Sequence, residues 1–120
     1  MVFLFGNTIP PQKDKAYNFK ITVERAPEGV KLICTEGCDW DELYFMTKDY
    51  KPQGVDKNGL TSVNKYFTTG DLSQPNFLFT LVKVDNEITL KGVKGTEWTE
   101  IKFDLPKRKG QLFNEKGKVK

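Results

Sequence analysis

The residue types best suited to chemistry gather in one stretch, CTEGCDWDELYF, which covers residues 34–45. Its two cysteines could bond to each other or hold a metal, its tryptophan could form a ligand platform, and its carboxylates could bind cations or move protons. At 92–103 the chain reads GVKGTEWTEIKF, with the same glycine, tryptophan and phenylalanine but no cysteine. The comparison separates residues that both stretches need from residues that only one needs.

Cys34 and Cys38 form the sharpest local feature. Gly92 and Thr96 replace them in the second stretch, so the two cysteines are present or absent together, as a bonded pair would be. Their Cα atoms must then lie within about 7 Å. Two free thiols, one of them buried at the end of a strand, are the alternative. A zinc site needs further cysteine or histidine ligands, which this sequence lacks. We therefore expect a disulfide and no metal.

The acids Glu36, Asp39, Asp41 and Glu42 are dense enough to suggest a cation or glycosidase site. However, their spacing differs from that of a calcium loop, and DKNG at residues 56–59 is too short to be one. We expect a solvated acidic turn.

Catalytic patterns are missing from the sequence. The chain has no histidine, which removes the commonest general base and the serine and cysteine arrangements that depend on it. No G-x-S-x-G, P-loop or dinucleotide-binding glycine pattern is present. We expect no catalytic residues, no cofactor and no enzymatic activity.

The sequence matches itself without a gap when residues 18–59 are aligned with residues 76–117. A match of this kind indicates an internal duplication. We interpret the chain as a single domain over residues 1–120, with a connector at 60–75. The identical pairs include Asn18/Asn76, Phe19/Phe77, Thr22/Thr80, Leu32/Leu90, Gly37/Gly95, Trp40/Trp98, Glu42/Glu100, Phe45/Phe103, Gln53/Gln111 and Gly59/Gly117.

Each unit has the pattern of β-strands. In NFKITVER, apolar and polar residues alternate with the period of a half-buried strand. APEG at residues 26–29 predicts a turn in which proline and glycine supply the special backbone angles. Gly59 and Gly117 each predict a turn with positive φ after a short strand. A unit of roughly 60 residues buries little surface alone. We expect an all-β fold: an antiparallel β-sandwich or flattened barrel of about six to eight strands, built from two tandem β-meanders.

Residues shared by both units are interpreted as scaffold, because two halves rarely need identical active sites. The repeated tryptophan is expected to pack and the repeated glutamine to satisfy buried backbone groups. The strand period assigns an inward face. Its members are Phe19, Ile21, Val23, Val30, Leu32, Leu43 and Phe45 in the first unit, and Phe77, Phe79, Leu81, Ile88, Leu90, Ile101 and Phe103 in the second.

Apolar residues on the outer face break the repeat and are the candidates for function. The first unit has Ile33, Tyr44 and Met46, where the second has lysines and an aspartate. Tyrosine and methionine are enriched at interfaces. These three residues are predicted to lie on neighbouring strands and either to form a partner surface or to pack under another segment.

The second unit has its own outer apolar residues, Leu78 and Val82. We expect an intramolecular cover for this side. The candidates for that cover are the N-terminal segment 2–5 and the connector, which carries Tyr66 and Phe67.

The pattern G-x-x-W-x-x-[L/I]-x-F followed by Q-x-x-[D/N]-x-x-G resembles one found in small, often duplicated bacterial proteins. The resemblance covers most of residues 18–117. It implies the fold and brings no assigned activity. Such relatives often look exported, which suits a cysteine pair. The pattern is carried by Gly37, Trp40, Leu43, Phe45, Gln53 and Gly59 together with their partners in the second unit.

These observations favour a non-enzymatic binding module that recognises another protein, such as an immunity protein, an inhibitor or an adaptor, through Ile33, Tyr44, Met46 and Trp40. A carbohydrate or small-ligand module using Trp40 and Tyr44 is the alternative. Phosphate or nucleic-acid contact through the basic C-terminus is a weaker third. That region has a net charge of +5 from Lys107, Arg108, Lys109, Lys116, Lys118, Lys120 and Glu115.

Localisation depends on the cysteines. No stretch approaches the roughly 20 apolar residues that span a bilayer, so we expect no membrane contact. The start, MVFLFGNTIPP, has no basic region or cleavage site typical of a signal peptide. A bonded Cys34–Cys38 pair would favour an exported or periplasmic protein, and free thiols would favour the cytoplasm.

Overall fold

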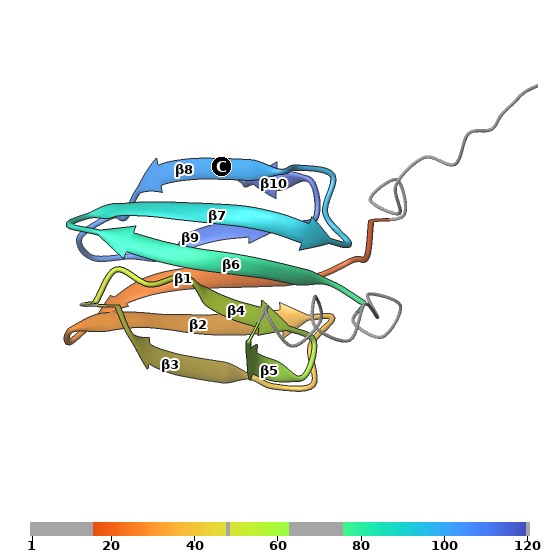
Figure 1. The fold of residues 1–120 in the computed structure, drawn as a ribbon, viewed down its shortest axis with the longest axis horizontal. Coiled ribbons are helices and arrows are strands. Elements are labelled where there is room, and N and C mark those ends of the chain that lie inside the picture. The colour runs from red at the N-terminus through yellow and green to blue at the C-terminus, as the bar shows by residue number, and fades with distance from the viewer. Residues whose placement is uncertain (1–15, 48, 63–75, 120) are drawn as a thin grey trace, which may run out of the picture.

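The protein is a β-sandwich. The structure, a computed structural model, describes residues 16–47, 49–62 and 76–119. These residues form two antiparallel five-stranded sheets packed face to face (Figure 1). The predicted all-β sandwich is confirmed. The flattened barrel is wrong, because the two sheets are not closed into one. No described residue belongs to a helix long and apolar enough to cross a membrane.

Ten strands are present in the described residues, more than the six to eight expected. The excess comes from the short strands that follow each glycine turn, which are too brief to show alternation in the sequence. The strands are β1 (Lys20–Ala26), β2 (Gly29–Glu36), β3 (Glu42–Met46), β4 (Gln53–Asp56), β5 (Gly59–Thr61), β6 (Leu78–Val84), β7 (Glu87–Lys94), β8 (Glu100–Asp104), β9 (Gln111–Asn114) and β10 (Gly117–Lys118).

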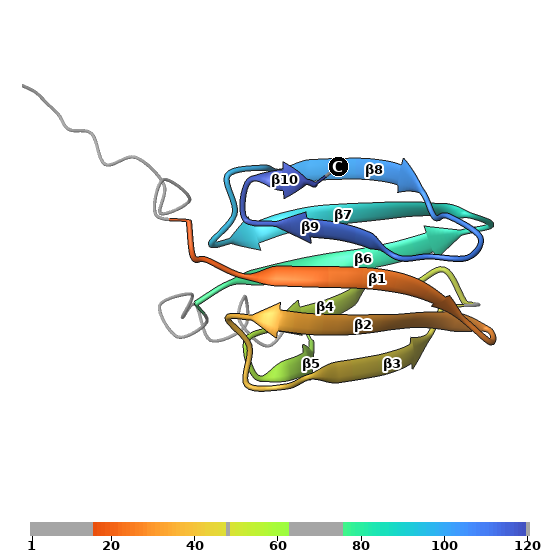
Figure 2. The same ribbon diagram turned by 180° about the vertical axis from the view of Figure 1, so that it is seen from behind.

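The two halves of the chain exchange their closing hairpins. One sheet has the order β10-β9-β1-β2-β3, and the other has the order β5-β4-β6-β7-β8. The hairpin β4–β5 therefore pairs with β6 of the second half, and β9–β10 pairs with β1 of the first. Figures 1 and 2 show the result: β3 and β5 lie at one side of the sandwich, and β8 and β10 at the other.

Strand register is the same in both halves. Val23 pairs with Leu32 in the first half, and their counterparts Leu81 and Leu90 pair with each other in the second. The β-bulge at the start of β1 also has its counterpart at the start of β6. Equivalent positions in the two sheets can therefore be compared directly.

The core lies between the sheets and is rich in phenylalanine. The residues assigned inward from the sequence are all buried except Leu43 and Ile101, which are partly buried and pack against the same cluster. Phe19 and Phe77 stack across the halves with ring centroids 4.5 Å apart. Aromatic pairs of this kind add to the stability gained from burying their area.

The turn at residues 26–29 forms where predicted, but for a different reason. The positive φ belongs to Glu28, at 60°, and not to the glycine. Gly29 is needed because a Cβ there would lie 2.0 Å from the carbonyl oxygen of Phe45 on the neighbouring strand. Gly59 and Gly117 do have the expected positive φ, 134° and 130°.

The outer apolar residues of the second half are covered. Leu78 is fully buried and Val82 is half-buried. The segments expected to cover them, residues 2–5 and the connector around Tyr66 and Phe67, lie outside the described residues.

Candidate functional site

The repeated tryptophans tie the two sheets together. Trp40, between β2 and β3, donates its indole N–H to the carbonyl oxygen of Asp56 in the opposite sheet, at 3.0 Å. Trp98 makes the equivalent bond to Asn114, at 2.9 Å. Trp98 is 8% exposed, and Trp40 packs partly buried against the core. Each tryptophan thus anchors the hairpin that its own half contributes to the other sheet.

The repeated glycine is required by a close approach of the backbone. Gly37 and Gly95 have φ values of 91° and 80°, which favour glycine. A Cβ at Gly37 would lie 2.3 Å from the carbonyl oxygen of Asn18, and one at Gly95 would lie 2.4 Å from that of Asn76. This glycine therefore belongs to the fold in both halves.

The repeated glutamine closes each exchanged hairpin. The side-chain nitrogen of Gln53 donates to the carbonyl oxygen of Thr61 at 3.2 Å, and that of Gln111 donates to Val119 at 2.8 Å. Both also donate to the carbonyl oxygen of the next residue, at 3.0 Å. As expected from the sequence, the glutamines satisfy backbone groups.

The predicted disulfide is confirmed. The sulfur atoms of Cys34 and Cys38 are 2.07 Å apart and the Cα atoms 6.3 Å apart. In the other half the hydroxyl of Thr96 donates to the carbonyl oxygen of Trp98 at 2.7 Å. A Cβ at Gly92 would lie 2.2 Å from that hydroxyl oxygen. The two halves therefore brace the same connection in different ways, one covalently and one by a hydrogen bond.

The acidic turn is solvated, as expected. Asp39 pairs with Lys57 at 3.5 Å. Glu36, Asp41 and Glu42 are exposed, and none forms an ion pair within the described part of the chain. The residues described contain no group of three side chains able to hold a metal ion.

The predicted binding residues are only partly brought together. Tyr44 and Met46 lie on β3, the edge strand of its sheet, and are 48% and 53% exposed. Ile33, on β2, is half-buried on the same outer face and pairs with Glu42. Trp40 does not join them, because its ring is packed against the core and its N–H is used between the sheets.

Tyr44 is held in place on this face. Its hydroxyl donates to the carbonyl oxygen of Pro27 in the β1–β2 turn, and the Met46 sulfur lies 4.0 Å from the same hydroxyl. Tyr44 is therefore an exposed aromatic ring that is already ordered, which lowers the entropy lost on binding.

The matching position on the other edge is charged. β8 ends its sheet as β3 ends its own, and it has Lys102 and Asp104 in place of Tyr44 and Met46. The ammonium group of Lys102 forms an ion pair with Glu100 at 3.7 Å. Charged side chains of this kind discourage edge-to-edge pairing of sheets.

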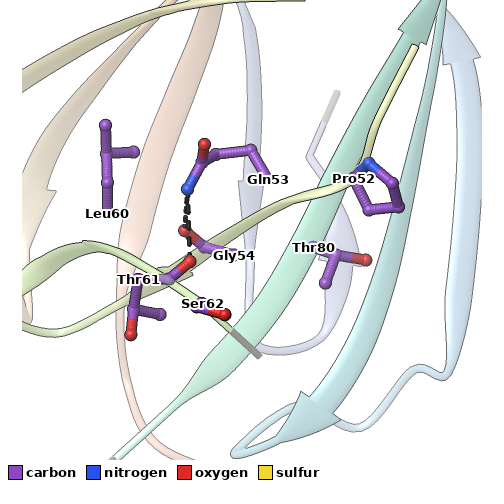
Figure 3. Close-up of a pocket in the computed structure, with 7 residues that line it drawn as sticks. All are labelled: Pro52, Gln53, Gly54, Leu60, Thr61, Ser62 and Thr80. Carbon is purple, nitrogen blue, oxygen red and sulfur yellow. Dashed lines mark hydrogen bonds between the residues drawn. The ribbon is translucent and has the colours of Figure 1, made fainter. Parts of the chain in front are cut away.

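A shallow depression of about 690 Å³ lies beside β4, β5 and β6 (Figure 3). Its lining includes Gly54 and Pro52, whose counterparts in the other half are Leu112 and Gly110. These differences between the halves are a sequence signal for the depression. It contains no titratable side chain and so offers no acid–base chemistry. The lining residues are Pro52, Gln53, Gly54, Leu60, Thr61, Ser62 and Thr80.

The basic loop between β8 and β9 adds one residue that sequence reasoning missed. Lys107, Arg108 and Lys109 line a hollow of about 180 Å³ with Arg25 and Glu24. The Arg25 guanidinium donates to the carbonyl oxygen of Leu105 at 2.9 Å. Arg25 is far away in sequence, so only the pairing of β1 with β9 brings it to the loop.

Tyr50 is a second residue missed by the sequence. It is exposed in the loop after β3, with a φ of 60°, and its counterpart in the other half is Arg108. Tyr44 was selected because it is aromatic and the equivalent residue of the other half is charged, and the same rule selects Tyr50.

Comparison with known proteins adds no functional information. No protein-family model, curated protein or solved structure matches this chain. The functional argument therefore rests on the geometry of the two halves and on the residues by which they differ.

Proposed function

We propose that this protein is a non-enzymatic binding module that recognises another protein through the outer face of β3. The observation that carries the proposal is the exposure of Tyr44 and Met46 on an edge strand whose counterpart is charged. The fold accepts Lys102 and Asp104 at the equivalent positions, so it does not require apolar residues there. An immunity protein, an inhibitor or an adaptor would all use such a surface.

Charge complementarity describes the partner further. Glu42 lies on this face, Glu36 ends β2 and Asp41 precedes β3; all three acids are exposed and have no ion pair within the described residues. A partner surface with an apolar centre and basic residues at its rim would match it. The carbohydrate alternative is not favoured, because Trp40 does not present its ring to solvent as a stacking platform.

The experiment compares capture by three immobilised proteins: the wild type, Tyr44→Asp and the matched variant Lys102→Asp on β8. Native extract of the source organism is passed over each, and bound proteins are quantified by mass spectrometry. We expect Tyr44→Asp to reduce capture of the specific partner about 100-fold, because the carboxylate is desolvated only in the complex. Lys102→Asp should capture it like the wild type.

Thermal unfolding supplies the control. Tyr44 is exposed, so Tyr44→Asp should lower the free energy of unfolding by no more than about 1 kcal/mol, the loss of its one hydrogen bond to Pro27. Equal capture of every protein by the wild type and Tyr44→Asp would refute a partner surface on β3.

We also infer that the chain is an internal duplication and that it works outside the cytoplasm. The equal registers and the repeated tryptophan and glutamine bonds support the duplication. The bonded Cys34–Cys38 pair supports an oxidising compartment, since disulfides are rare where thiols are kept reduced.

A further inference from the structure

The backbone of β3 presents hydrogen-bonding groups along its free edge. At the two ends of the strand, Cys34 N–H donates to Asp41 and Thr47 N–H donates to Glu28. Bonded and non-bonded pairs alternate in an antiparallel ladder. Leu43 and Phe45 therefore bond to β2, while the N–H and C=O groups of the residues between them point away. The residues with outward groups are Glu42, Tyr44 and Met46.

The same alternation holds on β8. The N–H of Gly92 donates to the carbonyl oxygen of Thr99, and the N–H of Leu105 donates to that of Asn86. These two bonds correspond to the bonds at the two ends of β3 in the first half. The two edges thus offer equivalent backbone groups, and they differ in side chains. On β8, Glu100 and Lys102 form an ion pair beside these groups. Of these two edges, β3 is the one that combines outward backbone groups with exposed apolar side chains.

A glutamate begins each of the two edge strands, and the two glutamates differ in whether a neighbouring lysine neutralises them. Glu42 corresponds to Glu100, but Tyr44 stands where Lys102 neutralises Glu100. Within the described residues no cation pairs with Glu42. A basic side chain brought by a ligand would complete for Glu42 the ion pair that the other half makes internally.

We propose that β3 binds an extended, basic segment of the partner protein as an added strand. This inference rests on the proposed function and specifies its binding mode. Backbone bonds to Glu42, Tyr44 and Met46 give affinity, and alternate side chains of the added strand give specificity. An apolar residue of the segment packs beside Tyr44, and a lysine or arginine lies opposite Glu42.

A second copy of this chain fits the edge less well. If two β3 strands paired antiparallel about Tyr44, each Glu42 carboxylate would face Met46 of the other copy. That arrangement leaves both carboxylates without a cation. Charge complementarity therefore favours a different, basic partner over self-association.

The test separates the backbone bond from the side chain at one position. Met46→Ala removes the thioether and keeps the outward N–H, whereas Met46→Pro removes that N–H as well. Proline is tolerated at this edge because the lost donor does not serve the pairing with β2. Asp104→Pro makes the same change on β8 and is the matched control.

Ten-residue peptides of random sequence, displayed on phage, are selected on the immobilised wild-type protein. We expect the enriched peptides to alternate apolar residues and to contain lysine or arginine. Their dissociation constants should be about tenfold or more weaker for Met46→Pro than for Met46→Ala, the size of one lost hydrogen bond. Asp104→Pro should bind them like the wild type.

Three results would overturn strand addition. The first is equal affinity of the enriched peptides for Met46→Pro and Met46→Ala, and the second is enriched peptides without basic residues. The third is a selection in which no enriched peptide binds more weakly when Met46 is replaced. If partner capture still fails with Tyr44→Asp, the binding face stands and only the binding mode is wrong. If Tyr44→Asp has no effect on capture, the proposed function fails first. A concentration-dependent dimer that Met46→Pro dissociates would assign the edge to a second copy.

Amide hydrogen exchange tests the edge without any variant. In the free protein, the amides of Glu42, Tyr44 and Met46 should exchange much faster than those of Leu43 and Phe45. An enriched peptide should slow the first group and leave the second unchanged. Slow exchange at Tyr44 in the free protein would mean that the edge is already paired, which would also overturn the proposal.

Discussion

Strands β3 and β8 are the same structural element in two halves of one chain, and only one of them is protected. Both end a sheet, both pair with the preceding strand in the same register, and both leave alternate backbone groups outward. β8 has Lys102 and Asp104 on its exposed face, and β3 has Tyr44 and Met46. Because the sandwich tolerates charges at these positions, the apolar pair is not a requirement of folding.

The same comparison assigns the shared residues to the fold. Glycine, tryptophan and glutamine recur with the same contacts in each half, so their presence needs no functional explanation. The stretch CTEGCDWDELYF therefore contains two kinds of residue. Gly37 and Trp40 build the sandwich, whereas Glu42 and Tyr44 belong to the surface that distinguishes one half from the other.

The largest expected effect is on stability and tests whether the halves are equally anchored. Trp98→Ala should lower the free energy of unfolding by about 3 to 5 kcal/mol, because it empties a buried site and removes the bond to Asn114. Trp40→Ala should cost less, since Trp40 is more exposed. Denaturant unfolding measures both. A larger loss for Trp40→Ala would reverse the proposed ranking of the anchors.

The second prediction replaces the disulfide of the first half with the hydrogen bond that the second half has at the same place. Replacing both Cys34 and Cys38 by alanine should cost about 2 kcal/mol, the chain-entropy value for so short a loop. The double variant Cys34→Gly/Cys38→Thr copies the other half and should cost less, because the threonine hydroxyl can donate to the carbonyl oxygen of Trp40. Urea unfolding compares the two.

The control for the disulfide is chemical. The unreduced wild-type protein should not gain mass from an alkylating reagent, and the reduced protein should gain the mass of two adducts. Equal stabilities of the alanine and the glycine–threonine variants would show that the hydrogen bond at Thr96 has no equivalent value in the first half.

The smallest expected change in stability comes from giving β3 the side chains of β8. Tyr44→Lys with Met46→Asp should alter the free energy of unfolding by no more than about 1 kcal/mol, since both positions are exposed and one hydrogen bond, to Pro27, is lost. The new lysine would neutralise Glu42, and partner capture should be lost. The reciprocal double variant, Lys102→Tyr with Asp104→Met, should bind the partner if side chains alone distinguish the edges.

Much of the sandwich could be predicted from the sequence because local alternation and the ungapped repeat specify faces. Phe19, Ile21 and Val23 lie inward as their spacing predicts. The hairpin exchange could not be predicted, because strand period does not identify a distant pairing partner. The orientation of Trp40 toward Asp56 depends on that exchange. Because the sequence does not show the exchange, it does not exclude Trp40 from the candidate binding residues.

The candidate site was predicted in part. Parity placed Tyr44 and Met46 outward, and it could not give the burial of Ile33, which depends on neighbours from other strands. The sequence also could not show that β3 lies at the edge of a sheet. Edge status follows from the order of strands, and that order is set by β9 and β4 joining β1 and β6.

The exchanged hairpins also set an order in which the protein can fold. Val55 pairs with Phe79 across little more than the connector, whereas Ile21 pairs with Phe113 across most of the chain. Contacts between distant residues form slowly, because the chain must lose more entropy before they close. During synthesis the sheet that contains β6 has all its strands before the other sheet receives β9. Until β9 is added, β1 is an open edge whose inward residues Ile21 and Val23 are apolar, and this nascent chain is the form most exposed to aggregation.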